Sequence, residues 1–300
     1  MRDKMGSQAY WDRWVIYVDK QQEQDLETIR KPSGNPQYRP QFIYEMSCGH
    51  LEQMLRRYSR GDDVATLASE IAPLIDLWEE AERIGKDVWT ADQQLTRHSW
   101  EKNLDFYISS FWLVGLSLTL DVAQPLWERL LALIGNEGED ELLDRIIATR
   151  QSGRRIGNKL CHPLPYRRLL AAVNAQQETE KALLLRDFVE HWYAELDRLP
   201  KKGLSRDTAV YERPYWYEFG DRNFDGGAYF GRWCIEAVAA VKAFGFNDGL
   251  CLGHPAYPGD LLRPFGPSTH VNVEVMSLPV IADNVILGNR KGWIRRLLNL

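Results

Sequence analysis

The chain has 300 residues, of which 44% are hydrophobic and 26% are charged. This composition is typical of a folded globular protein and excludes a disordered chain. The formal net charge of −5 argues against a dedicated nucleic-acid-binding protein, because phosphate binding favours an excess of Lys and Arg.

Nothing in the sequence indicates export or membrane insertion. The first five residues include three charged ones and lead into no apolar segment, so we expect no signal peptide. The longest uncharged run, 106–120, is too short to span a bilayer. The cysteines lack CxxC spacing and favour a reducing compartment, so we expect a cytoplasmic protein. These cysteines are Cys48, Cys161, Cys234 and Cys251.

Hydrophobic periodicity predicts helices along most of the chain. The first predicted helix covers residues 7–30, and the second ends near residue 60. The third contains Pro73, which should kink it. A central helix over about 98–121 is apolar on all sides, which predicts packing around its whole circumference.

Further helices are predicted in the second half, and the loops between them are short. Short loops favour helices that pack antiparallel to their neighbours, so we expect an all-α, multi-helix protein. The first of these helices begins near Pro125, and the others cover 139–152, 166–175 and 178–199.

The stretch 226–245 predicts one long helix that ends at Gly245. Its aromatic and aliphatic residues recur at helical spacing, and its alanines would let a neighbouring helix approach closely. Glu236 lies beside this apolar stripe, so its carboxylate must be hydrogen-bonded, paired or at the edge of the stripe.

The character of the sequence changes after residue 265. Residues 271–275 alternate with period two, which predicts a short strand, and 281–287 could pair with it in a small β-hairpin near the C-terminus. We therefore divide the chain into an N-terminal helical region (1–135), a C-terminal helical region (136–265) and a C-terminal extension (266–300).

Motifs of catalysis and cofactor binding are absent from the sequence. It has no GxGxxG, Walker A, HExxH or GxSxG motif, and its six histidines have no helical ligand spacing. We therefore expect no cofactor and no metal. Glu236, His254 and Asp260 are the one acid–base trio that would suit a hydrolase, although a structural role for Glu236 is favoured.

Acidic and aromatic segments suggest a partner surface instead. Residues 137–144 hold five acidic side chains and no Lys or Arg, and acidic residues outnumber arginines in the aromatic segment 211–225. Such segments are either solvated faces and core aromatics or a surface that docks a basic partner. The candidate contacts are Glu137, Glu139, Asp140, Glu141, Glu218, Asp221 and Asp225.

One motif resembles a known family. The pattern runs through Tyr229, Phe230, Gly231, Trp233, Glu236 and Ala237, then Asp248, and then Tyr257, Pro258, Asp260 and Leu261. It resembles the C-terminal signature of the PoNi proteins, immunity proteins against polymorphic nuclease effectors of bacterial antagonism, many of them delivered by type VI secretion.

The resemblance implies an all-helical, cytosolic, non-catalytic protein that binds and neutralises a nuclease toxin, a DNase effector. On this reading the motif residues are scaffold, and the acidic loops make the contacts. These scaffold residues are Tyr229, Trp233, Glu236, Asp248, Tyr257, Pro258 and Asp260.

Two alternatives remain open at this point. One is a helical hydrolase built around a buried Glu236, and the other is a helical adaptor that binds a partner other than a toxin. We expect neither direct binding of nucleic acid nor a membrane partner, and a homodimer is compatible with the sequence.

Overall fold

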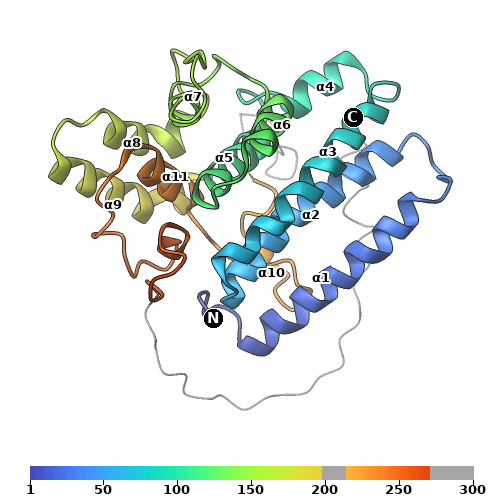
Figure 1. Ribbon diagram of the computed structural model, residues 1–300, viewed down its shortest axis with the longest axis horizontal. Helices are drawn as coiled ribbons and strands as arrows, with labels where there is room; N and C mark the ends of the chain where they lie inside the picture. The colour runs from blue at the N-terminus through green and yellow to red at the C-terminus, as the bar shows by residue number, and fades with distance from the viewer. Residues whose placement is uncertain (198–213, 271–300) are drawn as a thin grey trace.

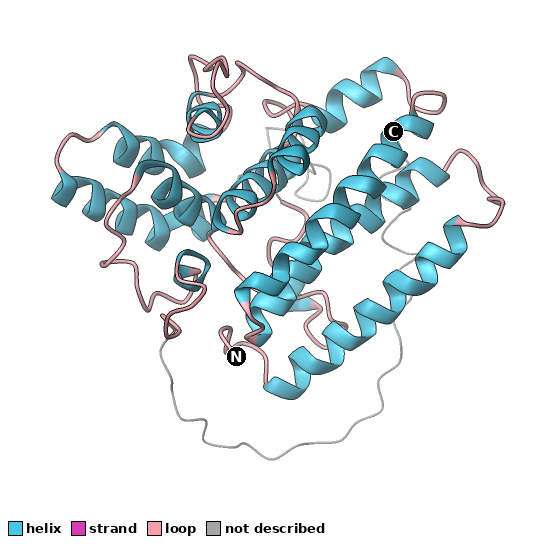
Figure 2. Ribbon diagram, in the orientation of Figure 1, coloured by secondary structure: helices cyan, strands magenta, loops and turns pink. Residues whose placement is uncertain are grey.

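The computed structural model describes residues 1–197 and 214–270, and within these ranges it is helical, without strands. Figure 2 shows helices joined by loops throughout this part. The all-α prediction is therefore confirmed for the described ranges, whereas the β-hairpin expected within 271–287 lies outside them.

The α-helices of the first half are α1 (Gln8–Ile29), α2 (Arg39–Arg60), α3 (Ile71–Gly85), α4 (Ala91–His98), α5 (Leu104–Thr119) and α6 (Gln124–Ile134). Those of the second half are α7 (Glu141–Ala148), α8 (Pro163–Asn174), α9 (Glu178–Glu195), α10 (Phe219–Arg222) and α11 (Ile235–Phe244).

Helices α1, α2 and α3 lie side by side, and each runs antiparallel to the next one in the chain (Figure 1). Helix α2 ends at Gly61, whose φ of +105° suits glycine. A 3₁₀ helix, Val64–Glu70, precedes α3, so Pro73 lies in the first turn of α3. At this position proline is not expected to kink α3, because the first turn of a helix has no intrahelical acceptor for the N–H that proline lacks.

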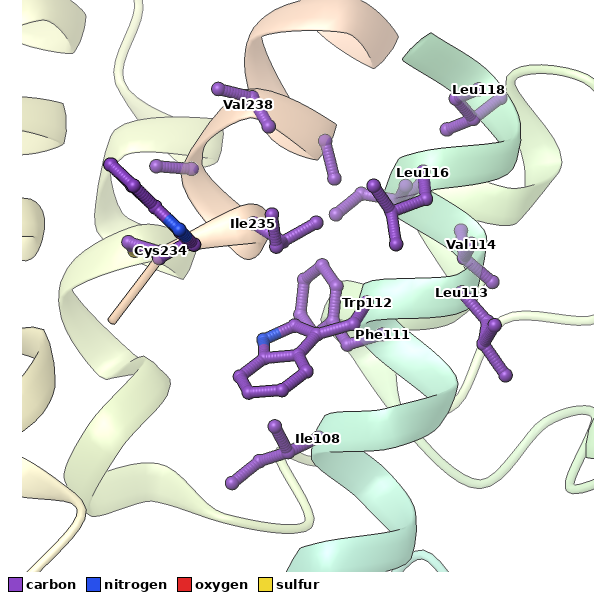
Figure 3. Packing of buried hydrophobic residues seen from close by; sticks show 14 of the residues in the cluster. Ile108, Phe111, Trp112, Leu113, Val114, Leu116, Leu118, Cys234, Ile235 and Val238 are labelled. Carbon is purple, nitrogen blue, oxygen red and sulfur yellow. The ribbon is translucent and has the colours of Figure 1, made fainter. Parts of the chain in front are cut away.

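Helix α5 is the centre of the molecule. All its residues except Asp105 and Ser109 are buried, which confirms the prediction of a helix packed on all sides. Helix α11 crosses it at Gly115, where a Cβ would lie 2.9 Å from the Cβ of Ala239. Figure 3 shows Ile235 of α11 beside residues of α5. The small residues of α11 therefore allow the close approach that the sequence predicts.

The prediction of one long helix over 226–245 is wrong for the first half of this stretch. Helix α11 begins only at Ile235, and the residues before it are non-helical. Gly227 and Gly231 have φ of +73° and +106°, and a Cβ on Gly231 would lie 2.3 Å from Oγ of Ser59. The segment therefore runs against α2 in a conformation that only glycine adopts easily.

One hydrophobic core joins both halves of the chain. It extends from α2 and α3 through α5 to α8, α9 and α11, and α8 and α9 form a second antiparallel hairpin (Figure 1). The division near residue 135 stays a prediction. None of the helices within the described ranges is long and apolar enough to cross a membrane.

Candidate functional site

Glu236 lies in the first turn of α11 and is completely buried. Its Oε1 atom accepts hydrogen bonds from the hydroxyl of Tyr166 (3.0 Å) and the indole N–H of Trp192 (3.1 Å). The Oε2 atom of Glu236 has no hydrogen bond of ordinary geometry among the described residues, but the Trp112 indole is close enough to lower the pKa of the carboxyl group. The carboxyl group thus joins α8, α9 and α11 inside the core.

Burial raises the pKa of Glu236 to about 7, although the hydrogen bonds from Trp192 and Tyr166 oppose this shift. A raised pKa alone would suit an acid–base catalyst. A side chain without exposed surface cannot reach a substrate, however, and the expected trio is not assembled. His254 accepts from the N–H of Ala256, and Asp260 has other partners.

Asp248 and Asp260 hold the loop after α11. The Asp248 carboxylate accepts a hydrogen bond from the hydroxyl of Tyr257 at 2.7 Å and two from the guanidinium of Arg263 at 2.8 and 2.5 Å. The Asp260 carboxylate accepts a hydrogen bond from Arg2 Nε at 2.6 Å. It also accepts hydrogen bonds from the backbone N–H and the hydroxyl of Thr269, at 2.6 and 2.8 Å. Burial alone would raise both pKa values, but these hydrogen bonds hold them below the usual range.

Two aromatic residues of the motif attach the segment before α11 to the first residues of the chain and to α2. The hydroxyl of Tyr229 donates to the Asp3 carboxylate at 2.7 Å, and the Trp233 indole donates to Ser59 Oγ at 2.8 Å. Pro258, the remaining motif residue, is buried beside Tyr257. No pattern in the sequence singles out Arg2, although it is a charged partner for the buried carboxylate of Asp260.

The first acidic loop contains one residue that cannot be a surface contact. Asp140 is fully buried; its carboxylate caps α7 through the N–H groups of Leu142 and Leu143 and also accepts the hydroxyl of Tyr107. The candidate contact at Asp140 is therefore corrected to a structural role. The spacing Asp140-Glu141-Leu142-Leu143 at a helix start is an N-cap signal that could have revealed it.

The other acidic candidates lie at the surface, and most of them have ion-pair partners. Glu137 is 3.9 Å from Arg155, and Glu141 is 3.5 Å from Arg145. Within the described ranges, Glu139 is exposed and has no ion-pair partner.

In the second acidic loop, Glu218 pairs with Arg222 at 2.5 Å and Asp221 with Arg232 at 2.5 Å. Asp225 is exposed and has no ion-pair partner among the residues described here. Helices α7 and α10 lie well apart in Figure 1, so the two loops do not form one patch.

The aromatic segment before α10 belongs mainly to the core. Trp216 is buried against Trp112 and Phe230, and Tyr217 stacks on Tyr193 at 4.5 Å. A small open hollow lies beside Trp216, with about 250 Å³ of space including open solvent. Small-molecule sites are usually larger and more enclosed. Within residues 1–197 and 214–270, no group of three potential ligands is placed to hold a metal ion.

Two family models match the chain. The model of the N-terminal part of the PoNe immunity protein (PoNi) matches residues 2–132, and the model of the C-terminal part of PoNe immunity proteins (PoNi) matches residues 138–261. The chain belongs to the PoNi family. A PoNi protein is an immunity protein and not an enzyme, which removes the hydrolase alternative built around Glu236.

A solved structure shares the fold of this chain. The crystal structure of protein PA2201 from Pseudomonas aeruginosa superposes on this PoNi chain with a TM-score of 0.59. The two chains are 20% identical, and the match covers 85% of this chain and 86% of the other. At this identity the likeness shows a shared fold alone. No curated protein matches the chain in sequence.

Proposed function

We propose that this protein binds a cognate nuclease toxin directly and neutralises it without any catalytic step. The observation that carries the proposal is the match of both PoNi family models over nearly the whole chain. The complete burial of Glu236 supports it, because the most perturbed carboxyl of the motif is sealed among Tyr166 and Trp192 and has a structural task.

The proposed contacts are the exposed acidic side chains of the two loops. A nuclease binds DNA through a basic cleft, and an acidic surface complements such a cleft and accelerates the encounter with it. Glu139 and Asp225 are the best candidates, since both are exposed and neither is neutralised by an ion pair within the described ranges. Glu137, Glu218 and Asp221 would have to exchange an internal arginine for the toxin.

The finer assignments follow from the same proposal. The toxin would be a DNase effector delivered by type VI secretion, and the immunity protein would act in the cytoplasm, where the DNA lies. Its net charge of −5 favours binding of a basic protein over direct binding of nucleic acid. Whether one or two copies bind each toxin is a separate question that the stoichiometry of the complex answers.

Co-expression in bacteria tests the proposal. The nuclease toxin encoded beside the gene is induced alone, together with the wild-type protein, or together with a variant carrying Glu139→Lys and Asp225→Lys. We expect full survival with the wild-type protein, reduced survival with the double variant and death with the toxin alone. Equal death with and without the wild-type protein would contradict the proposed function.

A further inference from the structure

Asp144 lies on α7 and is completely buried. Its Oδ2 atom accepts hydrogen bonds from three backbone N–H groups, those of Gly138 at 3.0 Å, Asp140 at 3.2 Å and Gly157 at 3.1 Å. Its Oδ1 atom accepts a hydrogen bond from Arg154 Nε at 2.7 Å. Both oxygens of this buried carboxylate are therefore satisfied, and most of the donors are backbone groups.

These hydrogen bonds join two loops around Asp144. One loop connects α6 to α7 and covers 135–140, and we call it the α6–α7 loop; the other connects α7 to α8. The loops cross in direct contact, because a Cβ on Gly157 would lie 2.4 Å from the backbone nitrogen of Asp140. The N–H of Arg155 also donates to Oε1 of Glu137 at 2.8 Å, so the second loop holds the first from outside as well.

Glu139 lies in the α6–α7 loop, between two of the residues whose N–H groups donate to Asp144. Its own N–H donates to the carbonyl of Asn136 at 3.1 Å, and its carbonyl accepts a hydrogen bond from Cys161 Sγ at 3.4 Å. Its side chain is exposed and has no ion-pair partner in the described part of the chain. The backbone of Glu139 is therefore fixed, whereas its carboxylate is in water.

The hydrogen bonds of Asp144 fix the loops and not the packing of α7. The helix is packed by the apolar side chains of its buried face, which are Leu142, Leu143, Ile146 and Ile147. The three N–H groups that donate to Asp144 all belong to residues outside the body of a helix. A loop that is ordered before binding loses little conformational entropy when a partner binds to it, so this network favours recognition by the loop.

We propose that Asp144 is a positioning residue for toxin binding, which holds the α6–α7 loop in the conformation that presents Glu139 to a basic group of the nuclease toxin. This inference rests on the proposed function and adds to it the residue that orders one of the two contact loops. Asp144 does not touch the toxin itself, because it has no exposed surface. Its effect on binding therefore passes through Glu139.

A double-mutant cycle tests this dependence. The dissociation constant for the purified nuclease toxin encoded beside the gene is measured by calorimetry for Asp144→Asn, Glu139→Ala and the double variant. Asparagine keeps the shape of Asp144 but has one acceptor oxygen in place of two, so the loop loses part of its support. We expect each single variant to weaken binding several-fold and the double variant to bind no more weakly than Glu139→Ala alone.

Gly157→Ala disturbs the same loop without changing a charge, because the added Cβ would meet the backbone of Asp140. It should weaken binding as Asp144→Asn does, again only where Glu139 is present. Gly34→Ala is the matched control, since nothing lies within 4 Å of its added Cβ, and it should leave binding unchanged.

Asp225→Asn is the control for the coupling. Asp225 is the other exposed carboxylate without an ion-pair partner among the described residues, and its loop lies well apart from α7 (Figure 1). Its effect on binding should therefore add to that of Asp144→Asn.

Hydrogen exchange of the free wild-type protein needs no variant and decides the matter if Asp144→Asn does not fold. The amides of Gly138, Asp140 and Gly157 should exchange slowly although these residues lie outside the helices, because Asp144 accepts their hydrogen bonds. Exchange at the rate of an unstructured chain would overturn the inference.

The remaining outcomes separate this inference from the proposed function. If the wild-type protein binds the toxin and folded Asp144→Asn binds it equally well, the positioning role is refuted and the proposed function stands. The same holds if Glu139→Ala binds at the wild-type affinity, or if the effects of Asp144→Asn and Glu139→Ala simply add. If the wild-type protein does not bind the toxin, both the inference and the proposed function are refuted.

Discussion

Arg2 Nε lies 2.6 Å from Oδ2 of Asp260, across a sequence separation of 258 residues. The same guanidinium lies over the ring of Tyr58 and donates to the carbonyl of Asp62 at 2.7 Å. The first residues of the chain therefore join the end of α2 to the last loop that the structure describes. This contact connects the two parts that the PoNi models match separately.

We expect Asp260→Ala to destabilise the protein by about 3 kcal/mol, because removing one partner of a buried ion pair leaves Arg2 unpaired. Urea denaturation measures this change. Arg83→Ala is the control, since its ion pair with Glu80 lies at the surface and should contribute little. Equal unfolding midpoints for Asp260→Ala and the wild type would refute the importance of this contact.

Two helical glycines should respond to alanine with opposite signs. At Gly49, in α2, nothing lies within 4 Å of the added Cβ, so Gly49→Ala should stabilise the protein by about 0.5–1 kcal/mol through helix propensity. At Gly115 the Cβ would meet Ala239 and Ile235 at 2.9 Å, so Gly115→Ala should destabilise it by about 1–2 kcal/mol. Thermal unfolding of the two variants distinguishes them, and a shift of the same sign in both would contradict the close crossing of α5 and α11.

The stability of the protein should depend on pH through Glu236. Burial raises its pKa from an ordinary 4.5 to about 7, so the folded state holds the proton more tightly than the unfolded state does. The protonated Glu236 carboxyl therefore makes its full contribution to the free energy of unfolding below pH 4.5. This contribution is lost as the pH rises through 7 and changes little at higher pH. Relative to Glu236→Gln, the wild type should lose about 3 kcal/mol between pH 4.5 and 8.

This prediction is checked by denaturation of both proteins at several pH values. The comparison with Glu236→Gln isolates this one group, because other buried carboxyls with raised pKa, such as Asp140, are present in both proteins. Parallel pH profiles for the two proteins would show that Glu236 does not titrate in this range.

Two neighbouring acidic residues should separate binding from folding. Glu139→Lys should slow association with the toxin several-fold at low salt, with a smaller effect at high salt, because an exposed charge acts through steering. Asp140→Ala should lower the free energy of unfolding by about 2–3 kcal/mol, because it removes the cap of α7 and a buried hydrogen-bond acceptor. Stopped-flow association and urea denaturation measure the two effects, and an unfolding effect of Glu139→Lys as large as that of Asp140→Ala would contradict this assignment.

Local patterns in the sequence predict much of this fold. The uncharged run in α5 indicates a buried central helix, and Gly61 and Gly245 indicate where two helices end. The helical class follows from periodicity alone. Helix α4 was not predicted. The capping box formed by Thr90 and Gln93 at its start is a local sequence signal that could have revealed it.

Tertiary contacts account for the rest. In the sequence, Gly227 and Gly231 are compatible with a helix that tolerates two glycines. In the structure, side chains of α1 and α2 occupy the space that a Cβ at these positions would need. Asp140 looks like part of an acidic surface until its hydrogen bonds turn it inward. Each of these residues is set by a partner distant in the chain.

The central claim is that this protein stops a nuclease by binding it. The most direct test is a titration of the purified toxin with the purified protein, in which cleavage of plasmid DNA is measured. We predict that cleavage falls in proportion to added protein and ends when the two reach a fixed stoichiometric ratio. Undiminished cleavage in a several-fold molar excess of the protein would contradict the claim.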